Sequence, residues 1–161
     1  MLAKKVTDMN IYRLLGAILC LVMGLSSLLY AADNKPAKDL QLSYVKAQGL
    51  PFSELVRVGN ILYLSGQIGF DNKLDGLVDG GITAETQQTM ENIKKLLSAH
   101  GSSMNKLIRC TVMMADMNEF ADMNRVYIGY FSDNLPARSA FGVTRLALGA
   151  RVEIECMGLL E

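Results

Sequence analysis

Residues 136–160 read PARSAFGVTRLALGARVEIECMGLL, and their alternation of apolar and polar side chains predicts two strands, at 137–146 and 151–160. The second strand has an apolar side and a mixed side, formed by Val152, Ile154 and Cys156 and by Glu153, Glu155 and Met157 respectively. Because only the apolar side suits a sealed core, helices are expected to cover one face of the sheet.

Upstream of this run, the pattern predicts two further strands, a helix, a strand and a second helix. The dipeptide Gly59-Asn60 suits a two-residue hairpin turn between strands. Thr83 and Asn118 are placed as N-caps, and His100, the only histidine, ends the first helix, where it suits the helix dipole better than catalysis. We expect strands at 55–58, 61–68 and 107–115, helices at 83–100 and 118–131, and a loop at 71–81.

The resulting order, ββαβαββ, predicts an α+β single domain with a mainly antiparallel sheet and two helices on one face. The second helix places Phe120, Met123, Tyr127 and Phe131 inward. The uncovered face of the sheet is mixed in polarity, which suits an interface containing pockets. Its predicted members are Tyr63, Ser65, Gln67, Arg109, Thr111, Met113 and Glu153.

The N-terminal region differs from the rest in composition. Lys4-Lys5 and Arg13 precede the apolar run 14–30, and Ala31-Ala32 follow it. This order is typical of a secretory signal, so residues 1–32 are predicted to be a signal peptide or, if uncleaved, an N-terminal anchor in the inner membrane. Residues 33–39 form a linker and residues 40–161 the domain. We therefore expect a periplasmic or secreted protein, with membrane contact only if the segment is uncleaved.

Charge and cysteine content limit the possible partners. The chain has 16 basic and 16 acidic residues, and removal of the leader leaves 13 and 15, a net charge of −2. Without a basic cluster, no nucleic-acid partner is expected. Cys110 and Cys156 share strand parity with apolar neighbours, which favours buried free thiols, although an oxidising compartment leaves a disulfide open. No metal-binding or phosphate-binding motif is found, so neither a metal nor a cofactor is expected.

Arg138 and Glu153 are the candidate chemical pair, placed on two strands that we expect to be neighbours. A guanidinium can bind a substrate carboxylate through two parallel hydrogen bonds, and a glutamate can move protons to and from water. Spacing alone favours a more ordinary interpretation, a solvated cross-strand ion pair without function.

The run 136–160, together with GNILYLSGQIG at 59–69, resembles the signature of the RidA (YjgF-type) family of enamine/imine deaminases. The resemblance extends over residues 40–161. It implies a chorismate-mutase-like fold and a homotrimer with sites in the clefts between subunits. It also implies hydrolytic deamination of small 2-imino or enamine acids to 2-oxo acids and ammonia.

By the same resemblance, Arg138 binds the substrate carboxylate and Glu153 activates water. Asn124 corresponds to an asparagine near the substrate, although an exposed helix amide is an equal interpretation of it. Ser65 and Gly66 match the site segment of the first hairpin, where a strand glycine can also mark only a bulge.

The sequence departs from the family pattern at three positions. Phe52 replaces a tyrosine that closes the pocket in many members, and Ala140 replaces a cysteine, although its backbone N–H can still donate to a carboxylate. Ala147 replaces a proline. These departures concern substrate preference and rate, and the sequence does not identify the natural substrate or pathway.

Two other function classes stay open. A non-catalytic trimer that binds small carboxylates, or acts as a holdase, would not require Glu153. An endoribonuclease activity is disfavoured by the acidic domain and by the export signal.

Overall fold

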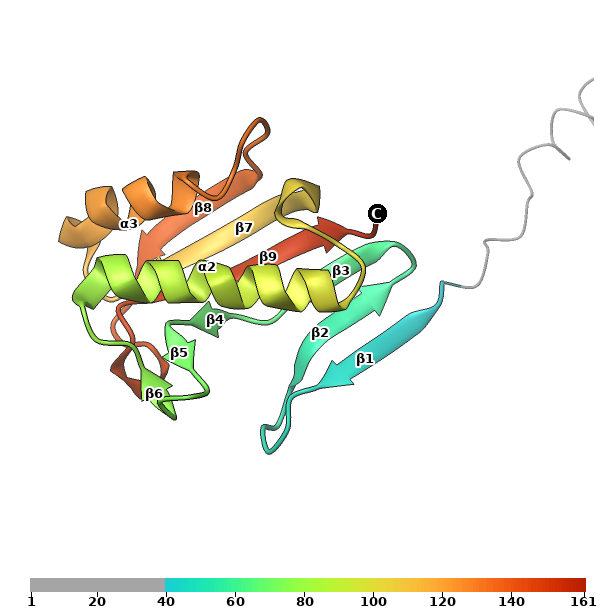
Figure 1. The fold of residues 1–161 in the computed structure, drawn as a ribbon, viewed down its shortest axis with the longest axis horizontal. Helices are drawn as coiled ribbons and strands as arrows, with labels where there is room; N and C mark the ends of the chain where they lie inside the picture. Colours follow the sequence, from blue (N-terminus) through green and yellow to red (C-terminus); the bar gives the residue numbers. More distant parts are fainter. Residues whose placement is uncertain (1–39) are drawn as a thin grey trace, which may run out of the picture. The chain divides into compact units, whose positions relative to one another are not determined.

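The computed structural model describes residues 40–161; the predicted signal or anchor at 1–32 and the linker at 33–39 lie outside the described residues. Seven strands form one sheet in the order β1-β2-β3-β9-β7-β8, with β4 also paired to β9, and both helices lie across one face of it (Figure 1). The bounds are β1 Leu42–Lys46, β2 Ser53–Val58, β3 Ile61–Leu64, β4 Gln67–Ile68, β5 Phe70–Asp71, β6 Gly76–Leu77, α2 Gly81–Ala99, β7 Leu107–Met114, α3 Phe120–Ile128, β8 Ala137–Gly142 and β9 Val152–Leu159.

The predicted α+β architecture is confirmed: every pair of strands is antiparallel except β7 with β8. Two elements were not predicted from the sequence: the edge strand β1 and the small β5–β6 hairpin within the expected loop. Among residues 40–161, no helix is long and apolar enough to cross a membrane.

The first hairpin turns at Gly59-Asn60, as predicted, with Val58 opposite Ile61 and Gly59 at φ 61°. The strand expected at 61–68 is interrupted, however. Tyr63 lies opposite Met157, and Gln67 lies opposite Ile154. The segment from β3 to β4 therefore contains one residue more than the stretch of β9 that it faces. The extra residue forms a bulge at Ser65-Gly66, between β3 and β4.

Both predicted N-caps are wrong, Thr83 by three residues and Asn118 by one, since Gly80 caps α2 and Glu119 caps α3. The chain enters α2 through two glycines with positive φ, Gly80 at 114° and Gly81 at 72°, so Thr83 lies inside the helix. Before α3, the Asp116 carboxylate accepts a hydrogen bond of 2.9 Å from the Asn118 backbone N–H, and a short 3₁₀ turn follows. His100 lies directly after α2, at its C-cap, as expected.

The core lies between the helices and the covered face of the sheet. Its fully buried members come from β3, α2, β7, α3 and β9: Leu62, Met90, Ile93, Leu97, Val112, Met123, Val152 and Ile154. The inward face predicted for the second helix is confirmed, since Met123 and Tyr127 are buried and Phe120 and Phe131 pack against the core.

Cys110 and Cys156 form a disulfide in this core, so the prediction of free thiols is wrong. The two residues are opposite each other in the β7–β9 ladder, with their Cα atoms 4.1 Å apart. Strand parity placed both side chains on the buried face, but parity does not give the register that brings the two sulfurs together.

Candidate functional site

Arg138 and Glu153 lie on opposite faces of the sheet. Arg138 is the register partner of Cys110, whose side chain is buried under the helices, so Arg138 also points to the helix side. Glu153 is the partner of Met113 on the uncovered face. The strands β8 and β9 are not neighbours either, because β7 lies between them. The expectation of adjacent strands is wrong because β8 pairs parallel to β7, and the chain must then cross β7 to reach β9.

The Arg138 guanidinium rests on aromatic rings of α3. Its Cζ lies 4.6 Å from the ring centroid of Tyr127 and 5.7 Å from that of Phe120. Among the described residues, the Arg138 side chain makes no hydrogen bond or ion pair, and its Nη1 is buried without a partner. A half-buried cation without a counter-ion is costly unless an anion can join it.

Two further unpaired polar atoms belong to the same face of α3. The Asn124 Oδ1 and the Tyr127 hydroxyl are both buried without a hydrogen-bond partner. Asn124 lies one turn from Phe120 and one from Tyr127, the residues whose rings face Arg138. The interpretation of Asn124 as an exposed helix amide therefore does not hold. Burial raises the pKa of Tyr127 to about 12, against an opposing effect of Arg138, so the hydroxyl stays neutral.

Glu153 projects from β9 against Gly66 in the bulge before β4. A Cβ at Gly66 would lie only 2.8 Å from the Glu153 Cδ, so only glycine leaves room for this carboxylate. Burial, with the neighbouring charge of Glu155, raises the pKa of Glu153. The bulge thus brings two of the predicted site residues, Gly66 and Glu153, into contact.

The remaining predicted residues are distributed around these two centres. The Ser65 hydroxyl donates a 2.7 Å hydrogen bond to the Ser53 carbonyl, so it ties the bulge to β2. Phe52 lies just before β2 with 48% of its surface exposed. Ala140 points to the same side of β8 as Arg138 and packs against the core.

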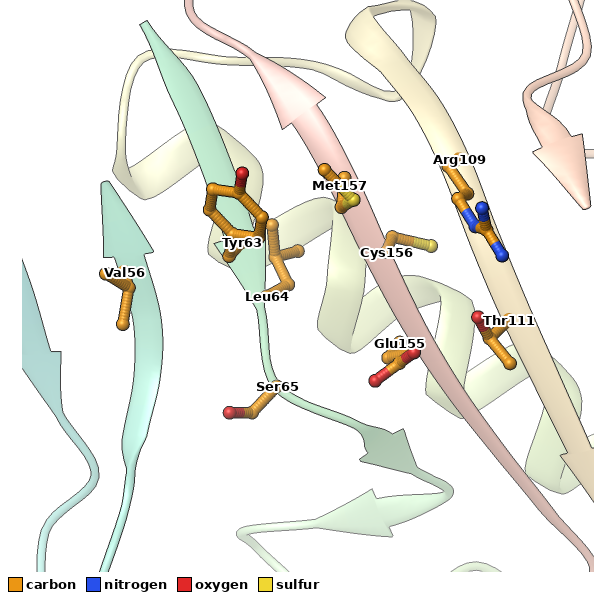
Figure 2. Close-up of a pocket in the computed structure, with 9 residues that line it drawn as sticks. All are labelled: Val56, Tyr63, Leu64, Ser65, Arg109, Thr111, Glu155, Cys156 and Met157. Carbon is orange, nitrogen blue, oxygen red and sulfur yellow. The ribbon is translucent and has the colours of Figure 1, made fainter. Parts of the chain in front are cut away.

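A cavity of about 280 Å³ opens on the uncovered face, across β2, β3, β9 and β7 (Figure 2). Its polar lining comes from Tyr63, Ser65, Arg109, Thr111 and Glu155. The parity of the strands predicted most of these residues for this face. A second cavity, of about 390 Å³, lies beside α2 and β5. Neither cavity is lined by Arg138 or Glu153, so neither encloses the predicted pair.

Sequence reasoning assigned Tyr127 and Phe120 to the core and missed their contact with Arg138. The signal was present: both are aromatic, on the inner face of α3, and the arginine follows on the strand that α3 precedes. Within residues 40–161, no group of three or more histidine, cysteine or carboxylate side chains could hold a metal ion.

Comparison with known proteins adds an independent result. Residues 45–159 match the family model described as Endoribonuclease L-PSP. A 2-iminobutanoate/2-iminopropanoate deaminase of Mus musculus is 41% identical over 68% of this chain and 81% of its own length. A RutC family protein of Pyrococcus horikoshii is 44% identical over 69% and 88%. The crystal structure of RidA from an Antarctic Psychrobacter has a TM-score of 0.67 at 35% identity, covering 77% of this chain and all of that one.

Proposed function

The chain belongs to the Endoribonuclease L-PSP family, which includes the RidA (YjgF-type) proteins, and from this membership we propose that it hydrolyses small 2-imino or enamine acids to 2-oxo acids and ammonia. The environment of Arg138 is the observation that supports this proposal most strongly. It is an arginine held on aromatic rings, without a counter-ion among the described residues, on a strand that also fits the family signature. Such a group suits a small carboxylate ligand.

The proposed reaction divides the work between two residues. Arg138 binds the substrate carboxylate and so orients the imine carbon. Glu153 accepts a proton from water as the water oxygen attacks that carbon, which gives a tetrahedral carbinolamine. Glu153 then returns this proton to the nitrogen. As the C–N bond breaks, the carbinolamine hydroxyl becomes the carbonyl of the 2-oxo acid and its proton passes to the departing nitrogen, which leaves as ammonia. The raised pKa of Glu153 supports this role, because a carboxyl that exchanges protons easily is a better acid–base group.

We place each site between two copies of the chain. Arg138 and Glu153 lie on opposite faces of one sheet, so a single copy does not bring them into one cleft. A second copy on the uncovered face can supply the missing partner. Exposed apolar side chains on that face support such an assembly: Leu42, Tyr44, Tyr63 and Phe141. The family resemblance favours a homotrimer.

The test is an assay for 2-oxo acid release, with an amino-acid oxidase generating imines from alanine or 2-aminobutanoate in situ. We expect the protein to accelerate release above the rate in buffer. If it gives no acceleration but still binds small 2-oxo acids, the non-catalytic binding protein is the better description. A ribonuclease activity has less support, since the domain without its leader carries a net charge of −2.

We also propose that the chain is exported. The order of charged, apolar and small residues in 1–32 supports a signal. The Cys110–Cys156 disulfide favours the same location, because such cross-links persist mainly in oxidising compartments. Cell fractionation with N-terminal sequencing of the mature chain tests this, and a cytoplasmic protein that retains Met1 would contradict it. An uncleaved, membrane-bound form would select the anchor.

A further inference from the structure

Arg138 differs from three other arginines of the domain, Arg57, Arg125 and Arg151, in what holds its guanidinium. The Arg151 Nη1 donates to Glu119 at 2.6 Å, the Arg125 Nη2 donates to Asp122 at 2.7 Å, and the Arg57 Nε donates to the Gly59 carbonyl at 2.6 Å. In the described part of the chain, Arg138 instead contacts rings: Tyr127 at 4.6 Å and Phe120 at 5.7 Å.

This difference matters for a group that must bind an anion. A carboxylate partner would fix the guanidinium but would neutralise it and occupy the N–H edges that a substrate needs. An aromatic ring contacts the flat face of the guanidinium, fixes its plane and leaves those edges free. The charge is retained for the incoming ligand.

Tyr127 is suited to hold such a plane. Only 2% of its surface is exposed, and its ring packs 5.0 Å from that of Phe131. It lies on α3, whose inner face is anchored in the core by Met123. A ring fixed in this way loses no further side-chain entropy when the substrate binds.

We propose that Tyr127 is a positioning residue for Arg138: its ring face holds the guanidinium plane in the orientation that binds a substrate carboxylate through two hydrogen bonds. The inference rests on the proposed function only in the assignment of Arg138 as the carboxylate-binding residue. Tyr127 itself does not contact the substrate. Its buried hydroxyl carries no charge that would compete for the guanidinium.

The experiment measures binding of 2-oxobutanoate, a carboxylate that cannot be deaminated, by calorimetry in the full-length protein. Tyr127→Leu removes the ring and should weaken affinity about 5- to 30-fold. Tyr127→Phe keeps the ring and should restore the parent affinity within about twofold. Phe120→Leu removes the more distant ring and should weaken affinity less than Tyr127→Leu does. Tyr130→Leu is the matched control, because Tyr130 bonds to Glu91 on α2 and does not contact Arg138.

A double-mutant cycle separates positioning from a general structural effect. In an Arg138→Ala background, Tyr127→Leu should cause no further loss of affinity, because the group it positions is gone. In turnover, Tyr127→Leu should raise KM and leave kcat close to the parent value. A merely structural change would lower kcat as well as raise KM, and would weaken affinity equally in the Arg138→Ala background.

Several results would overturn the inference. A folded Tyr127→Leu variant that binds as the parent does would show that the ring is not needed. Equal losses in Tyr127→Phe and Tyr127→Leu would assign the effect to the hydroxyl. If Tyr127→Leu fails to fold, an unchanged affinity in Phe120→Leu would count against the aromatic support. A parent that binds 2-oxobutanoate without deaminating imines contradicts the proposed function alone, and the binding comparison still decides the role of Tyr127.

Discussion

Arg138 and Glu153 should fail in different ways when they are altered, because one binds and the other transfers protons. Arg138→Lys keeps the charge but loses the planar pair of donors, so binding should weaken by about 1.5–3 kcal/mol if one charge-assisted hydrogen bond is lost. Glu153→Gln keeps the size of the side chain but removes the base, so turnover should fall about 10²–10⁴-fold. Steady-state kinetics with 2-iminopropanoate checks both. Parent rates in either folded variant would remove that residue from the proposed site.

Glu153 should also oppose the stability of the fold at neutral pH. Its pKa is raised in the folded chain, so folding disfavours the ionised form. The associated stability is present below the unfolded pKa and is lost as the pH rises through the folded pKa. Glu153→Gln should therefore melt at a higher temperature than the parent at neutral pH, with a smaller difference in acid. A lower melting temperature at neutral pH would indicate that the carboxylate is stabilised by contacts that this domain alone does not show.

The pH dependence of turnover should respond to Glu155, whose negative charge acts on Glu153. Burial is the larger cause of the raised pKa of Glu153, and the Glu155 carboxylate raises it further, so Glu155→Gln should lower that pKa. Because the proposed base works in its ionised form, activity should fall as the pH drops through the pKa of Glu153. The acid limb of the pH–rate profile should therefore move to lower pH in the variant. An unmoved acid limb would mean that another group controls it.

Gly66 should be required for the position of Glu153 more than for the fold. Any side chain at Gly66 would overlap the Glu153 carboxylate, so Gly66→Ala should displace it. We expect turnover to fall about tenfold or more, since small displacements of a catalytic group are costly. The Gly76→Ala variant is a matched control, because its nearest atom beyond its chain neighbours lies 3.8 Å away. Equal effects in the two variants would contradict a specific role for Gly66.

At the scale of elements, the disulfide joins two adjacent strands of the sheet, β7 and β9. It closes a loop between residues 46 positions apart, so replacing both cysteines by alanine should lower the free energy of unfolding by about 2–4 kcal/mol. Urea denaturation with and without a thiol reductant checks this, with the double-alanine variant as the control that reductant leaves unchanged. If reductant does not shift the parent's midpoint, the cross-link does not form in the protein.

Strand parity explains which parts of the site could be predicted from the sequence. Alternation in 151–157 gave the correct faces for Glu153 and Cys156, because the side-chain period of a strand is fixed. Parity says nothing about which strands are neighbours, so β7 between β8 and β9 was missed. Register is equally non-local, which is why the disulfide and the bulge at Gly66 appear only in the folded chain.

At the scale of the whole molecule, the uncovered face mixes exposed apolar side chains with polar and charged ones. Tyr63 is 41% exposed and Phe141 47% exposed on this face, beside a cavity that also contains the charged Arg109 and Glu155. A face of this composition is too apolar for solvent and too polar for a sealed core, which is typical of a protein–protein interface. The composition of this face supports the proposed assembly of copies, whose interface would also complete the proposed site.

Subunit mixing can test the proposed assembly and the proposed sharing of Arg138 and Glu153 between copies in one experiment. We expect residues 40–161 to sediment as a trimer at micromolar concentration. Homotrimers of Arg138→Ala and of Glu153→Ala should each be inactive. When the two are unfolded together and refolded, an interface can combine the intact Glu153 of the first variant with the intact Arg138 of the second. In a ring of head-to-tail contacts, random mixing restores about a quarter of the sites.

Activity near that fraction of the parent's would place Arg138 and Glu153 of one site on different copies. Inactive mixed trimers would mean that each copy supplies both residues, and a stable monomer would exclude the interfacial site.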